Sequence, residues 1–498
     1  MDFENRIYSG TLKNRITSAR DAAGLIRDGM TVACSGFTAC GYPKAVPLVL
    51  ADRVRRGETI RINLITGASV GEELDETLAS LDIIARRYPY QTGPIIKRSI
   101  NDGRIMYQDI HLSKLADQIR CGFLGRIDVA VIEATAILED GSVVPTTSVG
   151  NSPVFIEQAD RVIIEINTTQ PAELTGMHDI FVPGRYPHRQ PIPITDPAQR
   201  VGTTAVPCDP RKIAAICPCD IPDNPRPLAV VDEEARAIGH YLVEFINGAV
   251  RGRVCDDLPI FQSGVGTFAN VVLEEILHSD WTDILLWAEV IQDGIFDLID
   301  SGQLAFASGT SLTPSPEGLK RFYEHISRYR ERIILRPQEV SNSSEVVGRL
   351  GLVAMNTAVE VDIYGNVNSS HLSGNMVING IGGSGDFSRN ALISIFMTPS
   401  TGREGAFSRI VPHVTHVDHT EHEVHVIITE QGVADLRGLD PRERAVRIIE
   451  NCAHPRYREA LMDYYSRALR RGGHTPMLLD EAFRWHLNYA EKGDMLPE

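Results

Sequence analysis

The amino-acid sequence predicts an α/β protein built from two lobes, each with an open, mostly parallel sheet. Its 498 residues are more than one hydrophobic core usually organises. Short apolar runs alternate with stretches of helical periodicity in both halves, which is typical of parallel sheets. Twelve prolines crowd the region between about residues 168 and 230. We therefore predict a junction at Cys217–Pro227, with lobes at 1–225 and 226–498.

Composition narrows the class of protein. Hydrophobic residues make up 43% and charged residues 23%, as in ordinary soluble proteins. The formal net charge of -16 argues against nucleic-acid binding by general attraction, although it leaves room for a local basic pocket. No apolar run approaches membrane-spanning length, and the N-terminus lacks the apolar core of a secretory signal. We expect a cytoplasmic protein that binds neither nucleic acid nor membrane.

The eight cysteines are scattered along the chain. Cys217-Pro-Cys219 is their one close pair, and no second pair stands at a zinc-ribbon distance. This spacing favours reduced thiols over a structural metal site.

The first half repeats a strand, a glycine turn and a helix. Glycines at the end of a strand suit the close approach of a ligand or of another backbone. The loop at 36–44 contains neither GxGxxG nor GxxxxGK[ST], so a dinucleotide or P-loop site is weakly supported there. The predicted elements are a helix at 15–28, a strand at 29–36, a glycine loop at 36–44, a helix at 45–56, a strand at 60–65, a glycine turn at 66–71, a helix at 72–80, and strands at 127–134 and 161–166.

The second half opens with a helix that Asp232 caps. An apolar stretch at 258–261, a loop at 262–266 and a helix at 268–278 follow. Ile284–Trp287 is a short buried strand by its pattern, and a helix with Ile295, Leu298 and Ile299 on one face ends at Gly302. A strand at 304–307 completes a βαβ unit.

Glu289 falls at the carboxyl end of the first strand of this unit. In open α/β sheets, ligands bind at that edge. The alternative is a surface glutamate in an ordinary connection. Further along, we expect an apolar segment at 351–361, a turn at 364–366, strands at 391–397 and 424–429, and helices from Asp440 onward.

Three glycine-bearing loops and two carboxylates carry the candidate chemistry. The loops are Ser263–Gly266, Gly380–Gly385, and the one with Gly36 and Gly41. Glycine lets main-chain N–H groups converge on an oxyanion or phosphate, although each loop can also be a tight turn. Glu289 and Glu430, both at predicted strand ends, can act as an acyl nucleophile or as general acid and base. They can equally be solvated loop acids.

Five histidines at a spacing of three invite a metal interpretation: His413, His416, His419, His422 and His425. Histidine and carboxylate together suit zinc or non-haem iron. The intervening valines instead indicate a strand, a turn and a second strand, and residues three apart on a strand point to opposite faces. A hydrogen-bonded polar turn is favoured, and we predict no metal. We do not predict a serine hydrolase either.

Taken together, these stretches resemble the acetyl-CoA hydrolase/transferase family, in particular its succinyl-CoA:acetate CoA-transferases. The similar segments run through nearly the whole chain in the expected order. They are 35–44, 262–266, 289–293, 336–342, 356–366, 382–387, 416–422 and 430–432.

The resemblance implies two lobes of the NagB/RpiA/CoA-transferase type. It implies that Glu289 is the nucleophile that carries CoA as a glutamyl thioester. Backbone N–H groups of Val265 and Gly383 would form the oxyanion hole, and Glu430 and Asn342 would support the active site. The implied CoA contacts are Phe261, Gln262, Ser263, Gly264, Val265, Val359, Asn379, Gly383 and Arg403.

The sequence departs from the family pattern at two places. Arg403 stands where a lysine is expected, so a positive charge for phosphate is retained; its alternative role is to solvate a loop. Asp223-Asn-Pro-Arg226 differs in order from the Asp-Arg-Asn pattern associated with the substrate carboxylate, which puts that arginine's identity in doubt.

The resemblance thus predicts ping-pong transfer of CoA between succinyl-CoA and acetate. Alternatives are an acetyl-CoA hydrolase, a transferase using propionate or butyrate, and a non-catalytic acyl-CoA-binding protein. Acyl-CoA and short carboxylates are the expected partners. CoA would be substrate and covalent intermediate, with no permanently bound cofactor and no metal. A homodimer is expected from the family alone.

Overall fold

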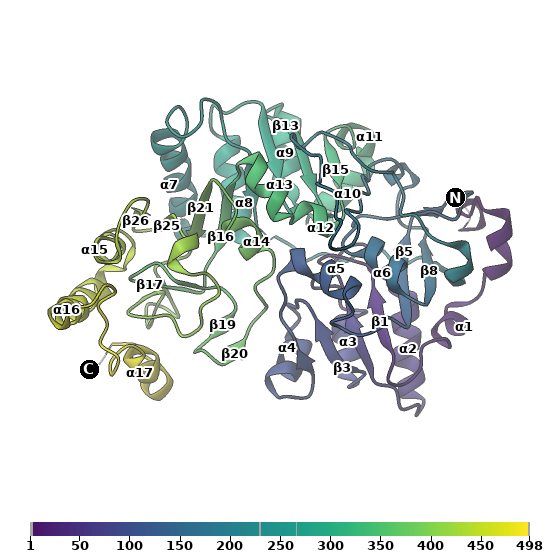
Figure 1. The fold of residues 1–498 in the computed structure, drawn as a ribbon, viewed down its shortest axis with the longest axis horizontal. Helices are drawn as coiled ribbons and strands as arrows, with labels where there is room; N and C mark the ends of the chain where they lie inside the picture. Colours follow the sequence, from purple (N-terminus) through teal and green to yellow (C-terminus); the bar gives the residue numbers. More distant parts are fainter. Residues whose placement is uncertain (1–2, 229–230, 265, 497–498) are drawn as a thin grey trace. The chain divides into compact units, whose positions relative to one another are not determined.

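The computed structural model describes residues 3–228, 231–264 and 266–496 (Figure 1). It contains two compact units. The first comprises Met1–Pro227 and Leu285–Leu350, and the second comprises Leu228–Ile284 and Gly351–Glu498. The change of unit after Pro227 lies near the predicted junction, but part of the second half clusters with the first unit. The assignment of residues 1–225 and 226–498 to two lobes stays a prediction.

The first unit contains a seven-stranded sheet in the order β4-β3-β2-β1-β5-β8-β9. All its neighbouring strands pair in parallel. The strands are β1 (Thr31–Cys34), β2 (Ile62–Ile65), β3 (Ile84–Tyr88), β4 (Met106–Tyr107), β5 (Val129–Ala134), β8 (Arg161–Asn167) and β9 (Ile213–Cys219). A small hairpin, β6 (Ala136–Ile137) and β7 (Val143–Val144), follows β5.

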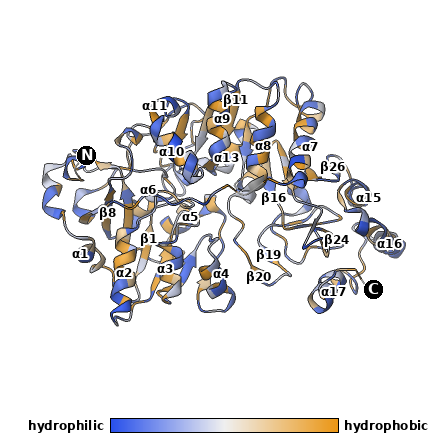
Figure 2. Ribbon diagram, turned by 180° about the vertical axis from the view of Figure 1, so that it is seen from behind, coloured by the Kyte–Doolittle hydropathy of each residue, from blue (hydrophilic) through white to orange (hydrophobic). Residues whose placement is uncertain are grey.

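Helices alternate with these strands because each carries one apolar face. In α5 (Leu112–Arg120) the buried residues are Leu112, Leu115, Ala116 and Ile119, the spacing that lines one side of a helix. Figure 2 colours the chain by hydropathy, and α2 (Ala45–Arg55) shows both hydrophobic and hydrophilic residues along its length. The helices are α1 (Ala19–Ala23), α2 (Ala45–Arg55), α3 (Asp75–Ser80), α4 (Pro94–Asn101), α5 (Leu112–Arg120) and α6 (Ser152–Gln158).

The later part of the first unit begins at Leu285, within β11 (Ile284–Trp287), and continues through α9 (Asp293–Ser301) and β13 (Leu304–Gly309). Gly302 ends α9 in the left-handed conformation, as a C-cap glycine does, and β13 pairs in parallel with β15. The remaining elements are β12 (Val290–Ile291), α9 (Asp293–Ser301), β13 (Leu304–Gly309), β14 (Ser311–Leu312), α10 (Pro316–Glu324), α11 (Ile326–Tyr329), β15 (Ile333–Leu335), α12 (Gln338–Ser341) and α13 (Ser344–Leu350).

The second unit is built on the strand order β10-β16-β21-β25-β26. The first four of these strands pair in parallel, and only β25 and β26 are antiparallel. These strands are β10 (Phe261–Ser263), β16 (Val353–Thr357), β21 (Ile393–Met397), β25 (Val426–Thr429) and β26 (Gly432–Asp435). The fold is therefore α/β with mostly parallel sheets, as the sequence predicts.

Smaller sheets and helices complete the second unit. Short strands are β17 (Glu360–Asp362), β18 (Val367–Asn368), β19 (His371–Leu372), β20 (Met376–Val377), β22 (Thr401–Gly402), β23 (Phe407–Ser408) and β24 (Ile410–Val411). Helices are α7 (Glu233–Ala249), α8 (Thr267–Leu277), α14 (Ser384–Ser388), the 3₁₀ turn η5 (Glu421–Glu423), α15 (Pro441–Cys452), α16 (Pro455–Arg471) and α17 (Arg484–Lys492).

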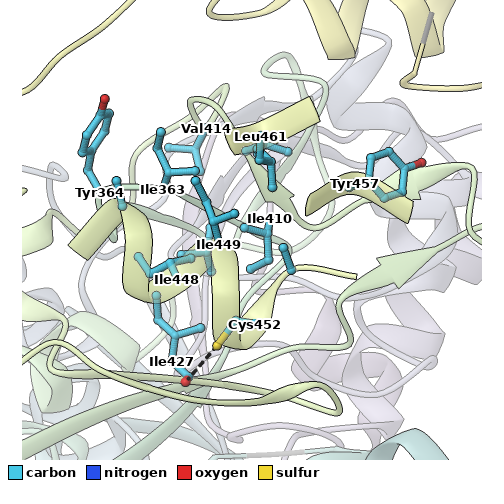
Figure 3. Close-up of a cluster of buried hydrophobic side chains, with 14 of the residues drawn as sticks. Ile363, Tyr364, Ile410, Val414, Ile427, Ile448, Ile449, Cys452, Tyr457 and Leu461 are labelled. Atoms are coloured by element: carbon cyan, nitrogen blue, oxygen red, sulfur yellow. Dashed lines mark hydrogen bonds between the residues drawn. The ribbon is translucent and has the colours of Figure 1, made fainter. Parts of the chain in front are cut away.

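The C-terminal helices share an apolar core with the short strands (Figure 3). Ile448 and Ile449 of α15 pack with Ile410 of β24 and Leu461 of α16. The Cys452 thiol donates a hydrogen bond of 3.4 Å to the carbonyl of Ile427 in β25. This contact ties α15 to β25, the strand that Glu430 follows.

Most predicted elements are confirmed, and three predictions are wrong in detail. The helix expected at 15–28 is only α1, because Ser18 caps its start and Gly24 follows its last residue. Gln262 and Ser263 belong to strand β10 rather than to a loop. The histidine segment is not a strand, a turn and a strand, since η5 and irregular backbone separate β24 from β25. Among the described residues, no helix is long and apolar enough to cross a bilayer.

Candidate active site

Glu289 lies where the sequence places it, just beyond β11 and before β12. Its backbone carbonyl accepts N–H groups of Thr310 at 2.8 Å and Ser311 at 3.1 Å. Its partly exposed carboxylate accepts a hydrogen bond from the side-chain amide of Asn342, which is fully buried. The carboxylate is therefore oriented by a donor that is itself held in the core.

A buried framework holds Asn342 in position. Asn342 follows α12, and the Trp287 indole donates to the carbonyl of Ser341 at 2.7 Å. The guanidinium of Arg336 lies 5.2 Å from the Trp287 ring and forms a buried ion pair with Asp179. Burial lowers the pKa of Arg336 to about 10, although Asp179 opposes the shift. Both the strand before Glu289 and the amide partner of Glu289 are thus anchored through Trp287.

The glycine loop after β1 packs beside the segment that holds Glu289. The Ser311 hydroxyl donates to the Phe37 carbonyl at 2.9 Å, and the hydroxyls of Thr38 and Thr313 are hydrogen-bonded. Gly36 has φ +107, and a Cβ there would lie 2.5 Å from the Tyr42 Cβ. Close packing against Tyr42 therefore explains Gly36 without a ligand.

Behind this loop is a buried charge network that the sequence did not reveal. The Lys44 ammonium lies 2.5 Å from Glu133 and 2.9 Å from Asp223. Asp223 also accepts from Thr147 at 2.7 Å and from Gln170 at 2.9 Å. Burial raises the pKa of Glu133 to about 7, while Lys44 acts in the opposite direction. The Asp223 carboxylate is thus used in the ion pair with Lys44 and in these hydrogen bonds.

Arg226 belongs to the same segment as Asp223, the segment that departs from the family pattern. Its side chain is exposed, and its guanidinium donates a long hydrogen bond of 3.5 Å to the Thr92 carbonyl. Its side chain is unlike the buried, paired arginine at 336. The described contacts give Arg226 no feature of a built carboxylate site.

The residues expected to contact CoA lie in the second unit. The Phe261 ring is 1% exposed and stacks on Trp281 at 5.3 Å. The Gln262 side-chain oxygen accepts the Met355 N–H at 3.1 Å. Both side chains are therefore used in packing, which leaves Gly264, at the end of β10, as the more accessible point. Val265 lies outside the described residues.

The Gly380–Gly385 loop leads into α14. Gly382 has φ +59, and the Gly383 carbonyl accepts the N–H groups of Asp386 at 2.9 Å and Phe387 at 3.1 Å. The Ser384 hydroxyl donates to the Ile381 carbonyl at 2.7 Å. The fully buried His419 ring contacts the same hydroxyl through Nε2 at 3.0 Å. His419 therefore holds the turn that presents Gly383.

Arg403 is exposed at the tip of the β22–β23 hairpin, with φ 53. Glu404 is also left-handed, with φ 56, and the Gly405 N–H closes the turn on the Gly402 carbonyl at 3.1 Å. Left-handed backbone is costly for residues with a Cβ. Strain of this kind often accompanies functional loops.

Arg409 is a residue that sequence reasoning missed. Its guanidinium donates to the carbonyl of Val359, a predicted CoA contact, at 3.3 Å. Burial lowers the pKa of Arg409, and the carboxylates of Glu234, Glu360 and Glu430 oppose the shift. Its Nε is buried without a hydrogen-bond partner among the described residues. No local pattern in Phe407–Ile410 signals this position.

Glu430 follows β25 and is held from several sides. The Ser400 N–H donates to it at 2.7 Å, the Ser400 hydroxyl donates to its other oxygen, and the Gln431 amide donates at 2.9 Å. Asn379, also predicted as a CoA contact, is partly buried after β20. The first unit thus contains the Glu289–Asn342 pair and the loop with Gly36 and Gly41. The second contains the loops Ser263–Gly266 and Gly380–Gly385, together with Glu430 and Arg403.

Two family models match this chain. The acetyl-CoA hydrolase/transferase N-terminal domain matches residues 2–218, and the corresponding C-terminal domain matches residues 318–465.

Three curated relatives are similar over nearly their whole length. Succinyl-CoA:acetate CoA-transferase of Clostridium kluyveri is 48% identical, over 99% of this chain and 92% of that protein. Acetyl-CoA hydrolase of Eremothecium gossypii is 43% identical, over 99% and 98%. Propanoyl-CoA:succinate CoA transferase of Escherichia coli is 41% identical, over 96% and 98%.

Solved structures share the fold. RipA from Yersinia pestis aligns with a TM-score of 0.72 and 23% identity, covering 94% of this chain and 100% of that one. A 4-hydroxybutyrate CoA-transferase from Porphyromonas gingivalis aligns with a TM-score of 0.64 and 20% identity, covering 92% and 98%. The architecture is therefore one that CoA-transferases use.

Proposed function

Because this chain belongs to the acetyl-CoA hydrolase/transferase family, we propose that it transfers CoA between succinyl-CoA and acetate through a thioester on Glu289. The observation that carries the proposal is the Glu289–Asn342 pair. A carboxylate at a strand end, oriented by a buried amide, has the geometry that a nucleophile needs. The 48% identity to a succinyl-CoA:acetate CoA-transferase supports the choice of substrates.

The reaction proceeds by acyl substitution at Glu289. Its carboxylate attacks the acyl-CoA carbonyl, a C–O bond forms, the C–S bond breaks, and a mixed anhydride and CoA thiolate result. The thiolate attacks the glutamyl carbonyl, which releases the first carboxylate and leaves glutamyl-CoA. A second carboxylate attacks this thioester, and the freed thiolate then takes the new acyl group. Glu289 is regenerated without net consumption of water.

Each step forms a tetrahedral oxyanion, for which we assign the backbone N–H groups of Val265 and Gly383. The tie from His419 to Ser384 supports this role, because it steadies the turn at Gly383. Losing one such donor typically costs ~10²–10³ in rate. Glu430 is held by Ser400 and Gln431 and is assigned as a supporting acid. Gly264, Val359, Asn379 and Arg403 are assigned to CoA.

An acetyl-CoA hydrolase is the second candidate. The 43% identity to a protein of that name favours it. In this case water, instead of a second carboxylate, would attack the glutamyl thioester. For the assembled enzyme we expect a cytoplasmic homodimer.

Trapping the glutamyl thioester tests the mechanism. The protein is incubated with acetyl-CoA, reduced with borohydride and digested, and mass spectrometry locates any glutamate reduced to an alcohol. We expect the change at Glu289 alone, and its absence in Glu289→Gln. Glu317→Gln, at an exposed position of α10, is the matched control and should be labelled at Glu289 as in the native chain. An unmodified Glu289 in an active enzyme would refute the mechanism.

An acceptor assay separates the two reactions. With acetyl-CoA as donor, a transferase makes succinyl-CoA only when succinate is present and releases little free thiol. A hydrolase releases thiol at the same rate with and without succinate. Thiol release that ignores the acceptor would overturn the transferase assignment.

A further inference from the structure

Three metal-ligating side chains meet in the second unit, outside the residues assigned to catalysis. His371 lies on β19, and His416 and Asp418 lie in the segment between β24 and η5. One ligand atom from each of the three lies within 4.8 Å of the others. The two imidazole rings have centroids 3.8 Å apart. Of the five histidines spaced by three, only His416 takes part in this group.

The backbone fixes the group in place. Val367 and His419 exchange main-chain hydrogen bonds of 2.8 and 3.0 Å, and the Asp418 N–H also donates to the Val367 carbonyl, at 2.9 Å. The Asn368 side chain bonds both main-chain groups of His371, at 3.0 Å to its N–H and 2.9 Å to its carbonyl. These contacts hold the ligand-bearing segments together through hydrogen bonds of the protein itself.

Hydrogen bonds from neighbouring residues orient Asp418 and His371, as hydrogen bonds to the ligands do in metal sites. The Asp418 carboxylate accepts the Ser369 N–H at 2.7 Å and the Ser370 hydroxyl at 2.7 Å. That hydroxyl also contacts His371 Nδ1 at 2.7 Å, which leaves Nε2 as the ring nitrogen for a ligand.

The one ligand separation that joins His416 to Asp418 fits a tetrahedral ion. Zn²⁺ with bonds of about 2.0–2.1 Å separates its ligand atoms by about 3.4 Å. His416 Nε2 and Asp418 Oδ1 are 3.3 Å apart. The His416 side chain is 38% exposed, whereas that of Asp418 is 4% exposed. An ion here would therefore have an entry path and a fourth position for water.

We propose that His371, His416 and Asp418 form a binding site for one Zn²⁺ ion or a chemically similar divalent transition metal. Two imidazole nitrogens and a carboxylate oxygen are a ligand set that suits zinc. The ion ties β19 to the segment before η5 and stabilises the second unit. Because none of the three residues has a role in the proposed transfer, this site and that function can fail separately.

Direct metal titration of the full-length protein tests the site. After treatment with EDTA and removal of the chelator, the protein is titrated with Zn²⁺ by calorimetry. Native protein should bind one equivalent at micromolar concentrations, and excess Zn²⁺ should raise the Tm by about 5 °C. His371→Ala and His416→Ala should each weaken this binding by more than ~10², since even outer partners of a metal cost 10–100-fold.

Two controls make the result specific. His422→Ala changes an exposed histidine of the same segment that is not in the group, and it should bind like the native protein. Because the chain has eight free cysteines, Co²⁺ is used as a spectroscopic probe, and its spectrum should lack thiolate charge-transfer bands. His416→Gln, at a partly exposed position, provides a second ligand variant if an alanine variant misfolds. Native protein with no micromolar site, or variants that bind equally well, would overturn the proposal.

Discussion

Replacement of Arg403 by glycine should make the protein more stable and a worse enzyme. Arg403 and Glu404 are the two central residues of the turn Gly402–Gly405, with φ values of 53° and 56°. A residue with a Cβ in this conformation carries roughly 1–2 kcal/mol of strain. Glycine removes the strain but makes the unfolded chain more flexible, which costs about 0.4–1 kcal/mol.

The net gain is about 0.5–1 kcal/mol for either Arg403→Gly or Glu404→Gly. Of the two side chains, only the arginine carries the positive charge that the proposed phosphate contact requires. A hydrogen bond to a charged group contributes about 1.5–3 kcal/mol, which corresponds to roughly 10–100-fold in KM for acyl-CoA. Because Arg403 is exposed, we expect the lower end of this range.

The two glycine variants form a matched pair. Urea unfolding should give them equal gains in stability, whereas steady-state kinetics should show a raised KM only for Arg403→Gly. Glu404→Gly should keep the native KM or lower it slightly, since a negative charge is removed. If both variants keep the native KM, Arg403 is a solvated loop residue and its assignment to CoA is wrong. If neither gains stability, the strain argument fails.

Three further outcomes follow from buried groups. Asn342→Ala should lower kcat by roughly 10², because a misoriented nucleophile costs about that much; a kcat within a factor of two of native would contradict the orienting role. Lys44→Met leaves Glu133 and Asp223 facing each other in the core and should cost about 3–5 kcal/mol of unfolding free energy in urea; a loss below ~1 kcal/mol would show that the two acids do not need Lys44. Burial lowers the pKa of His178 to about 4, below the value of about 6.5 in an unfolded chain. Below pH 6.5 His178 becomes protonated in the unfolded chain but stays neutral in the folded protein. The free energy of unfolding that is present above pH 6.5 is therefore lost as the pH falls toward 4. Native protein should therefore lose about 3 kcal/mol more than His178→Gln between pH 7 and pH 4, and equal losses would refute the assignment.

Local pattern was sufficient for the elements that position the site. The apolar run Ile284–Trp287, the helical spacing after it and Gly302 correctly predicted β11, α9 and the C-cap. Pattern was insufficient where packing decides the outcome. Gln262 looks like a loop residue, but its side chain is paired with the Met355 backbone inside a parallel sheet. The helix predicted at 15–28 has the right composition, yet its caps shorten it to five residues.

Contacts between distant residues carry most of what the sequence could not reveal. Asn342 is 53 residues from Glu289, and only the resemblance pointed to it, because one asparagine after a short helix has no periodic signal. The route that joins them runs through Trp287 and the Ser341 carbonyl, and Arg336 packs on the same indole. A change at Arg336 should therefore move both Asn342 and Glu289, although Arg336 touches neither in the contacts described above.

The histidines also show that sequence spacing does not reveal which side chains come together in the fold. A regular spacing of three indicated a metal only if the five rings converged, and strand geometry argued that they do not. The structure separates them: His419 lies under the Gly383 turn, His425 accepts the Ser394 N–H, and His422 is exposed. His416 gains its partner from His371, which lies outside the regular spacing, through the pairing of Val367 with His419. A metal site can therefore arise beside a misleading repeat, because ligands are brought together by backbone pairing and not by their interval in the sequence.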